Sequence, residues 1–287
     1  MTLIIDAMLS MTGRVTMLGL SRWTEKGGSY RTVQRFFKEK IAWSTLRWQL
    51  IKQHTQETKG PWLLIGDEVM VTKSGKETHG LGTFFSSIYN KPLPGLCFLN
   101  LSLLSVETRT AYPLITEQLV RNDVQASAPK AVKPKNQKPG RPKGSVNKNR
   151  KSVELSSFQQ QLQACINASL TLTGLNFGIV YFVYDGALGN NAGLQAVTQT
   201  GLHLICKLRH DSQLYFPYQG EYSGKGKPRK YGEKLTLETL TDAHRKSETV
   251  EKGIQTCTYQ TQVWHKNFPE LLNVVIIVKT NLKTGRV

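Results

Sequence analysis

The sequence predicts an α/β fold in which helices flank a mixed β-sheet, with a helical region before it and a β-rich segment after it. Residues 62–65 are continuously apolar, as expected for a central strand buried on both faces. Residues 97–105 alternate between apolar and polar side chains, which is the period of a strand. Residues 179–209 read as a strand, a short helix and a second strand, the pattern of a parallel crossover.

The composition indicates a polyanionic partner. The chain has 287 residues, and its hydrophobic content of 39% is sufficient for a packed core. It carries 38 Lys and Arg against 20 Asp and Glu, which gives a formal net charge of +18. An excess of this size favours nucleic acid as the partner, and the alternative is a basic surface that contacts only solvent.

Several classes of protein are not expected. The cysteines are far apart and form no CxxC pair, so we expect neither a zinc site nor a disulfide framework. The N-terminus carries Asp6 and no basic segment, unlike a secretory signal. No apolar run approaches the roughly 20 residues of a membrane-spanning helix. These features favour a cytoplasmic protein with no membrane partner.

Residues 1–58 are expected to be helical. Val33, Phe36, Phe37 and Ile41 repeat at helical spacing, and Ser29 or Thr32 is the expected cap. The stretch GGSYRTVQRFFKEK is similar to the turn and second helix of a helix-turn-helix, which would present four cations to phosphates: Arg31, Arg35, Lys38 and Lys40. An ordinary amphipathic helix with a basic outer face explains the same pattern.

Residues 59–209 are expected to form the core. Strands at 61–71, 82–89 and 97–105 follow one another closely, which suggests an antiparallel meander. A helical stripe follows, made of Leu155, Phe158, Leu162, Cys165, Ile166 and Ser169. The strand that comes next ends in IVYFVYDGALGN, where a single acid, Asp185, follows an apolar run.

A basic segment interrupts this core. Residues 127–151 contain nine Lys or Arg, four Pro and no acid, so we expect a disordered cationic insertion. Its KPGRPKG is similar to an AT-hook core, which would place Lys138, Arg141 and Lys143 on the minor groove. A linker that binds phosphates without sequence preference is the alternative.

Residues 210–287 are expected to form a partial β-rich insertion subdomain. Strands are predicted at 234–239, 254–264 and 274–280. A second basic loop, SGKGKPRKYGEK, offers Lys227, Arg229 and Lys230 to DNA. The last strand and NLKTG read as half a β-hairpin without its second strand.

Two acids define a candidate metal site. Asp67 ends the first apolar strand, and Asp185 ends a later one. If these strands are neighbours, the two carboxylates meet at one edge of the sheet and can hold Mg²⁺ or Mn²⁺, in a two-ion site that cleaves phosphodiesters. Each Asp alone also fits a strand-end cap.

The order of these elements is the layout of a ribonuclease H-like fold, and the motifs point to a family. IGDEVMVTKSGKETHGLGTFFSSIYNKPLPG, VYDGALGN, GKGKPRKYGEK and GGSYRTVQRFF together resemble DDE-type transposases of bacterial insertion sequences, in the group with a β-strand insertion. The resemblance implies that Asp67 and Asp185 are the first two catalytic acids. It implies double-stranded DNA as partner, at transposon ends and target, two metal ions, homo-oligomeric synaptic complexes and a nucleoid-associated location.

The family's third acid is a Glu within Y-x2-R-x3-E-x6-K on a helix, and the match here is imperfect. Tyr231, Lys234, Glu238 and Arg245 hold the spacing with Lys and Arg exchanged. Leu235 and the residues after it alternate as a strand does, so Glu238 is the weaker candidate. We expect instead that the third acid lies beyond residue 287, and that this chain binds DNA but cleaves it little. The alternatives are an active nuclease that uses Glu238 and a non-catalytic DNA-binding remnant that represses transposition.

Overall fold

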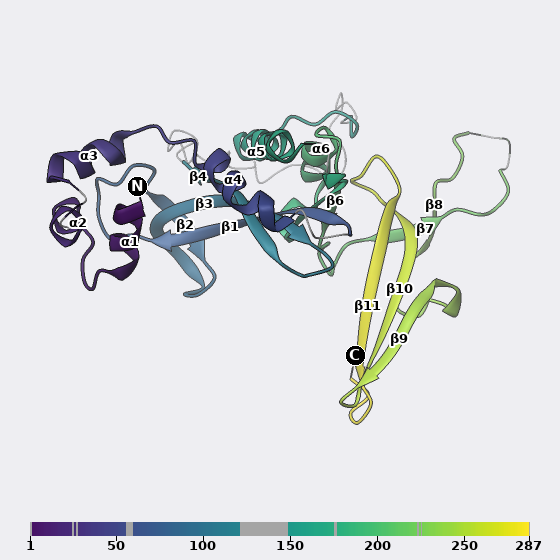
Figure 1. Ribbon diagram of the computed structural model, residues 1–287. Coiled ribbons are helices and arrows are strands. Elements are labelled where there is room, and N and C mark those ends of the chain that lie inside the picture. The colour runs from purple at the N-terminus through teal and green to yellow at the C-terminus, as the bar shows by residue number, and fades with distance from the viewer. Residues whose placement is uncertain are drawn as a thin grey trace, which may run out of the picture. The chain divides into compact units, whose positions relative to one another are not determined.

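The computed structural model describes residues 2–24, 26, 28–55, 60–120, 149–174, 177–222, 224 and 226–286. Their contacts divide the chain into two compact units, residues 1–50 and 51–287. Helices and two sheets, one mixed and one antiparallel, make up the structure, which confirms the predicted α/β class (Figure 1).

The first unit is helical and has a small core of its own. Its helices are α1 (Thr2–Ser10), α2 (Met17–Trp23), α3 (Tyr30–Lys38) and the start of α4 (Trp43–Thr55). Thr16 caps α2, because its side chain accepts a hydrogen bond from the Gly19 amide at 3.0 Å. Apolar side chains from α1, α2 and α3 pack together, namely Ile4, Ala7, Leu20 and Val33 with Met11 and Phe36 around them.

The apolar stripe predicted for α3 is only partly correct. Val33 is buried and Phe36 packs against the core, but the Phe37 side chain is 43% exposed. Ile41 lies beyond the end of the helix. Ser29 occupies the N-cap position, and its side chain makes no capping hydrogen bond. The helix therefore packs through two positions one turn apart, and its other faces meet solvent.

The second unit begins with a mixed sheet. Its strands are β1 (Trp62–Thr72), β2 (Gly82–Ser86), β3 (Lys91–Ser105), β4 (Ala111–Leu119), β5 (Tyr181–Tyr184) and β6 (His203–Cys206). The order is β2-β3-β1-β5-β6, and β4 also pairs with β3. β1 runs parallel to β5 and β5 parallel to β6, whereas β1 is antiparallel to β3. The parallel crossover predicted for residues 179–209 is thus confirmed.

The predicted meander is wrong, because β3 and not β2 is the neighbour of β1. β3 is 15 residues long and alternates buried and half-buried positions from Gly95 to Ser105. Such a strand has room for more than one partner on its outer edge, where its first residues pair with β2 and its later ones with β4. The pattern of residues 97–105 was read correctly, but the length of the strand and the existence of β4 were not predicted.

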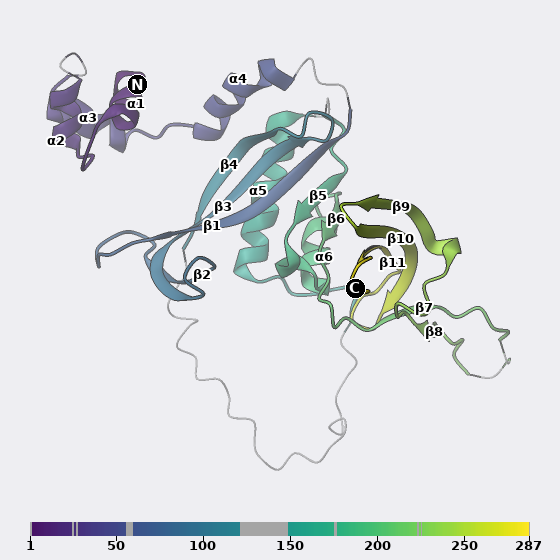
Figure 2. The same ribbon diagram turned by 90° about the horizontal axis from the view of Figure 1, so that it is seen from below.

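Two helices cover one face of this sheet (Figures 1 and 2). They are α5 (Ser157–Thr173) and α6 (Asn191–Thr198). Ser156 and Gln159 form a capping box at the start of α5. The buried stripe of α5 includes Leu162, Cys165 and Ile166, as predicted, while Leu155 precedes the helix. Burial raises the pKa of the Cys165 thiol to about 11, so this cysteine stays protonated in the core.

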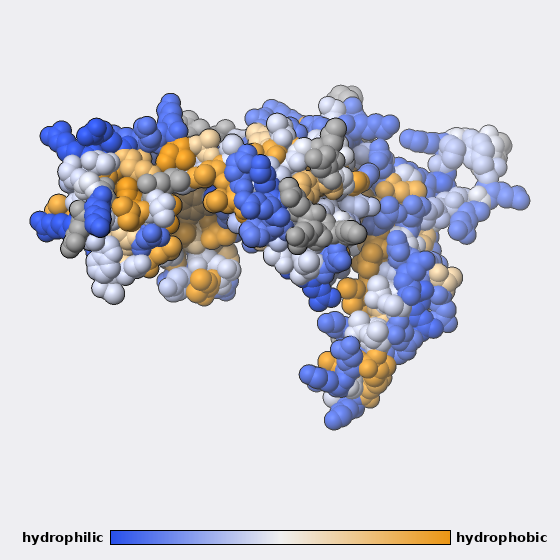
Figure 3. All heavy atoms as spheres, in the orientation of Figure 1, coloured by the Kyte–Doolittle hydropathy of each residue, from blue (hydrophilic) through white to orange (hydrophobic). Residues whose placement is uncertain are grey.

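A second sheet follows in the same unit, with order β11-β10-β7-β8 and β9 paired to β10. Its strands are β7 (Leu214–Pro217), β8 (Tyr231–Lys234), β9 (Arg245–Glu251), β10 (Ile254–His265) and β11 (Leu272–Asn281). The exposed residues of β11 include Val275 and Ile277, and apolar patches lie among hydrophilic residues over this sheet in Figure 3.

One prediction for this segment is wrong. The strand expected at 234–239 ends at Lys234, and a turn follows in which the Thr239 hydroxyl accepts a hydrogen bond from the Thr236 amide at 2.8 Å. The strands expected at 254–264 and 274–280 are present as β10 and β11, which pair along ten residue pairs. The alternation that suggested a strand at Leu235 and Leu237 belongs to this turn.

Candidate functional site

Asp67 lies within β1, and Asp185 is the residue that follows the neighbouring parallel strand β5. β1 and β5 pair Leu64 with Phe182 and Ile65 with Val183. Extended by two residues, which takes it one residue past the end of β5, this register sets Asp67 beside Asp185. Strand neighbours lie about 4.8 Å apart, and in-register residues project from the same face. The chain therefore carries both acids to one edge of the first sheet.

Each carboxylate is held by a single backbone hydrogen bond. One oxygen of Asp67 accepts from the Glu68 amide at 2.8 Å, and one oxygen of Asp185 accepts from the Ala187 amide at 2.9 Å. Both side chains are exposed. No described residue donates a hydrogen bond to the second oxygen of either one. Both acids can therefore direct an oxygen to a ligand in solvent.

The opposite face of the same edge carries a hydrogen bond that the sequence did not suggest. The Tyr184 hydroxyl donates to Glu68 Oε1 at 2.9 Å, and the Cys97 thiol lies 3.9 Å from Glu68 Oε2. Tyr184 is almost fully buried. Tyr184 and Glu68 each adjoin one of the acids in the sequence, so this bond links the two strands next to the acid pair.

The electrostatics of Tyr184 also indicate that these acids are close together. Burial raises the pKa of Tyr184 most, and the charge of Glu68 and its hydrogen bond raise it further. The charges of Asp185 and Asp67 add to the increase. Burial and then Asp185 likewise raise the pKa of Cys206, which pairs with Tyr184 on β6. This edge of the sheet is negative in a protein that is strongly positive.

Two glycines allow the close packing around this edge. A Cβ on Gly66 would lie 2.8 Å from Phe182 Cζ and 2.9 Å from Tyr184 Cδ2, so those rings cross directly over the backbone of β1. A Cβ on Gly189 would lie 2.8 Å from the carbonyl oxygen of Lys207. A larger residue at Gly66 would thus collide with neighbouring rings, and one at Gly189 with neighbouring backbone.

The pair of acids suits a hard divalent cation. Carboxylate oxygens are the ligands that Mg²⁺ prefers, and it is commonly bound by one or two carboxylates together with waters and substrate phosphates. Asp67 and Asp185 supply that number. In the part of the chain that the structure describes, no three His, Cys, Asp or Glu side chains form a cluster able to hold a metal.

The other predicted site residues lie elsewhere. Glu238 is exposed in the turn after β8 and is not helical, unlike the family's third acid. On α3, Arg31 and Arg35 are exposed one turn apart. Three of the DNA-binding candidates fall outside the described residues: Lys138, Arg141 and Lys143.

The basic loop before β8 is anchored to aromatic side chains. The Arg229 guanidinium lies 4.9 Å from the centre of the Tyr218 ring, and Lys230 Nζ lies 3.2 Å from the centre of the Trp264 ring. Lys227 is exposed nearby. Among the described helices, none is long and apolar enough to cross a membrane.

Comparison with known proteins identifies the family. A family model described as DDE superfamily endonuclease matches residues 1–269. No curated protein matches the chain. The family acts on DNA, and its endonucleases generally use divalent metals. The match confirms the DDE resemblance drawn from the motifs, and because it covers almost the whole of the 287 residues, the chain belongs to the DDE superfamily of endonucleases.

Proposed function

We propose that this protein is the transposase of an insertion sequence, and that Asp67 and Asp185 are metal-binding acids of its phosphodiester-cleaving site. The observation that supports this most strongly is the parallel β1–β5 register, which aligns the two carboxylates. The strongly positive composition supports DNA, at transposon ends and target, as the substrate.

The two acids would hold Mg²⁺ or Mn²⁺, which supplies Lewis-acid stabilisation of the charge that develops on a phosphodiester. The protein's own contribution is to fix the acids before the ion arrives. The Ala187 amide orients Asp185, and the Glu68 amide orients Asp67. The Tyr184–Glu68 hydrogen bond holds the two strands together on the other face. Strand transfer to target DNA and synapsis by a homo-oligomer are parts of the same proposal.

Metal binding tests the site without requiring turnover. Mn²⁺ titrated into the protein and followed by electron paramagnetic resonance should show binding that Asp67→Asn and Asp185→Asn each weaken by roughly tenfold or more, about 1.4 kcal/mol. Asp211→Asn is the matched control, because Asp211 is an exposed acid paired with Arg209 at 3.4 Å. Equal affinity in all three variants would refute the site.

We propose further that residues 1–287 cleave DNA slowly. Among the described residues, two acids, Asp67 and Asp185, lie together at the proposed metal site, whereas the family resemblance implies three catalytic acids. A missing ligand in a two-metal site removes several kcal/mol of transition-state stabilisation, so rates fall by orders of magnitude. Nicking of supercoiled plasmid with Mn²⁺ measures this. If nicking is rapid and Glu238→Gln abolishes it, then Glu238 is the third acid and the proposal of slow cleavage is wrong.

A second candidate function is DNA binding without cleavage, as in a repressor of transposition. The basic face of α3 favours it, because Arg31 and Arg35 are exposed on a unit with its own core. Specific binding to terminal inverted repeats should survive Asp67→Asn combined with Asp185→Asn and should be lost in Arg31→Gln with Arg35→Gln. Loss of repeat binding in the double Asn variant would exclude this function.

A further inference from the structure

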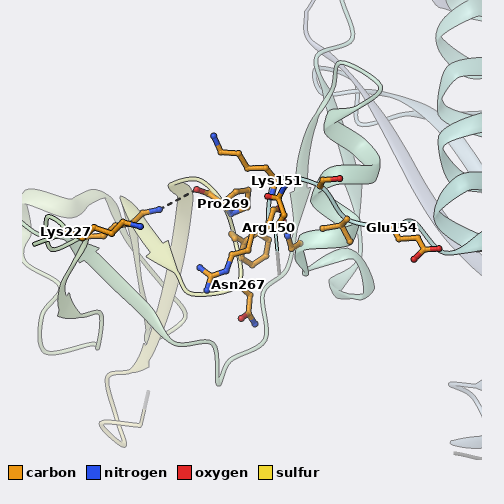
Figure 4. Close-up of a pocket in the computed structure, with 12 residues that line it drawn as sticks. Arg150, Lys151, Glu154, Lys227, Asn267 and Pro269 are labelled. Carbon is orange, nitrogen blue, oxygen red and sulfur yellow. Dashed lines mark hydrogen bonds between the residues drawn. The ribbon is translucent and has the colours of Figure 1, made fainter. Parts of the chain in front are cut away.

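A basic pocket lies between the first sheet's helical layer and the second sheet, within residues 51–287. Its volume is about 1180 Å³. One wall is the segment 149–154, which leads into α5, and Asn191 at the start of α6 adjoins it. The facing wall is made by Lys227 and Lys230, before β8, and by residues 267–269, between β10 and β11 (Figure 4).

Hydrogen bonds fix parts of both walls. The Asn191 side-chain amide donates to the Arg150 carbonyl oxygen at 2.9 Å. Lys230 Nζ donates to the Pro269 carbonyl oxygen at 3.5 Å, the dashed line in Figure 4. The ring of Trp264 lies under the same ammonium group. Several side chains of the pocket are therefore positioned before any ligand binds.

The charge in the basic pocket is strongly positive. Four of the side chains that line it are cations, Arg150, Lys151, Lys227 and Lys230, and one is an acid, Glu154. Figure 4 shows the Glu154 carboxylate pointing away from the labelled basic side chains. In the described part of the chain, no ion pair involves Arg150, Lys151 or Lys227. A polyanion can thus bind here without displacing a carboxylate.

The pocket also contains a buried acceptor that lacks a donor. Asn191 Oδ1 is inaccessible to solvent and has no hydrogen-bond partner among the described residues. Its orientation is fixed, because the amide nitrogen of the same side chain donates to Arg150. Because this oxygen is closed off from solvent, a ligand bound in the pocket does not contact it, and Asn191 contributes by positioning Arg150.

The size and location of the pocket favour a polymer near the acid pair. Small-molecule sites are mostly apolar and about 300–1,000 Å³, whereas this one is larger and its lining is mainly polar. Asn191 follows Asp185 by six residues through the short η3 helix (Gly186–Leu188). A strand bound in the pocket therefore contacts the same connection that carries Asp185.

We propose that the basic pocket binds the DNA strand that flanks the cleaved phosphodiester, with phosphates on Arg150, Lys151 and Lys227. The inference rests on the proposed function for its choice of strand. Its contacts come from two segments 76 residues apart, the end of the basic insertion and the loop before β8. Neither segment alone forms the pocket.

The salt dependence of DNA binding tests the phosphate contacts. Fluorescence anisotropy of a labelled 30-base-pair duplex in EDTA compares the wild type with the triple variant Arg150→Gln, Lys151→Gln, Lys227→Gln. Each phosphate contact contributes about 0.9 to the slope of log affinity against log salt. We expect the slope to fall by about 2 to 3.

A control variant removes the same charge elsewhere in the same unit. Lys246→Gln, Lys279→Gln and Lys283→Gln change three exposed lysines of the second sheet and the turn after it. This triple variant should lower the slope by less than about 1. Equal reductions in the two triple variants would show that only the overall charge matters and would overturn the proposal.

Asn191→Leu tests the hydrogen bond that positions Arg150. It should weaken binding about fivefold and leave the salt slope nearly unchanged, because the charges of the pocket remain. Unchanged affinity would overturn the role of Asn191. If Asn191→Leu fails to fold by circular dichroism, Asn191→Asp replaces it and is expected to weaken binding more, through repulsion of phosphate.

The pocket and the acid pair can fail separately. Binding in EDTA does not involve a metal, so Asp67→Asn with Asp185→Asn should bind the duplex as tightly as the wild type or more tightly. A normal salt slope in the pocket triple variant, together with Mn²⁺ binding by the acids, refutes the pocket alone. A reduced slope without Mn²⁺ binding refutes the proposed metal site and leaves the pocket as a DNA site.

Discussion

Tyr184 donates a hydrogen bond of 2.9 Å to Glu68, across 116 residues of sequence and from one strand of the acid pair to the other. Both residues project from the face opposite to Asp67 and Asp185, because side chains alternate along a strand. The bond therefore acts as a positioning contact for the edge where the acids meet. It also satisfies a buried phenol, which would otherwise lose its hydrogen bond to water.

Tyr184→Phe should destabilise the protein by about 1–3 kcal/mol, because the Glu68 carboxylate loses its tyrosine donor. Urea denaturation followed by circular dichroism measures the loss. Tyr181→Phe, on the same strand but 44% exposed, is the control and should cost less than about 0.5 kcal/mol. Equal stability of the two variants would mean that the Tyr184–Glu68 bond contributes nothing.

Gly66→Ala should cost about 1–3 kcal/mol, because its Cβ would meet the rings of Phe182 and Tyr184 at 2.8 and 2.9 Å. The rings can relieve this contact only by moving away from β1, which would also disturb the pairing of the acids. Gly19→Ala is the control, since its nearest neighbour is the flexible end of Met11 and helix α2 gains from alanine. If Gly66→Ala left the free energy of unfolding unchanged, the rings would have room to shift.

The sequence was sufficient to predict the parts of the fold that depend on periodicity. The apolar run before Asp67 and the one before Asp185 each predicted a strand, and both strands exist. Asp185 directly follows β5, as expected, whereas the expectation that Asp67 ends its strand is wrong, because β1 continues to Thr72. Because each acid ends an apolar run, the pairing of Asp67 with Asp185 followed once the strands were assumed to be neighbours. The alternating pattern around Leu99 and Leu101 likewise predicted a buried strand face.

What the sequence could not supply were contacts between distant segments. Glu68 and Tyr184 adjoin the acids, but nothing in a linear pattern indicates that a phenol and a carboxylate 116 residues apart share a hydrogen bond. The basic pocket was missed for the same reason, since Arg150 and Lys227 approach it from different elements. The false strand at 234–239 arose because apolar and polar residues alternate in a turn as they do in a strand.

Asp67→Asn should stabilise the metal-free protein. Asp67 lies beside Asp185 and near Glu68, so three negative charges repel one another there until a cation binds. We expect a rise of a few degrees in the melting temperature in EDTA, and loss of the further rise that Mn²⁺ gives the wild type. Asp211→Asn should show neither effect. A lower melting temperature for Asp67→Asn in EDTA would contradict the repulsion.

His265 should make the protein less stable as the pH falls. Burial and then the charge of Arg150 lower the pKa of His265, and its Nδ1 accepts a hydrogen bond from the Asn267 amide at 3.1 Å. With a folded pKa below the ordinary 6.5, the unfolded state binds the proton more readily, so stability is lost as the pH falls through 6.5 towards the lowered pKa. His265→Asn keeps an acceptor but cannot titrate.

Urea denaturation between pH 7.5 and pH 5 should therefore show a shallower loss of stability in His265→Asn than in the wild type. Arg150→Gln removes the second cause of the shift, so the pKa of His265 measured by nuclear magnetic resonance should rise in that variant towards 6.5. DNA bound in the basic pocket should raise it as well, because phosphates offset the charge of Arg150. A His265 that titrates at or above 6.5 in the free wild-type protein would contradict both expectations, since neither burial nor Arg150 would then oppose its protonation.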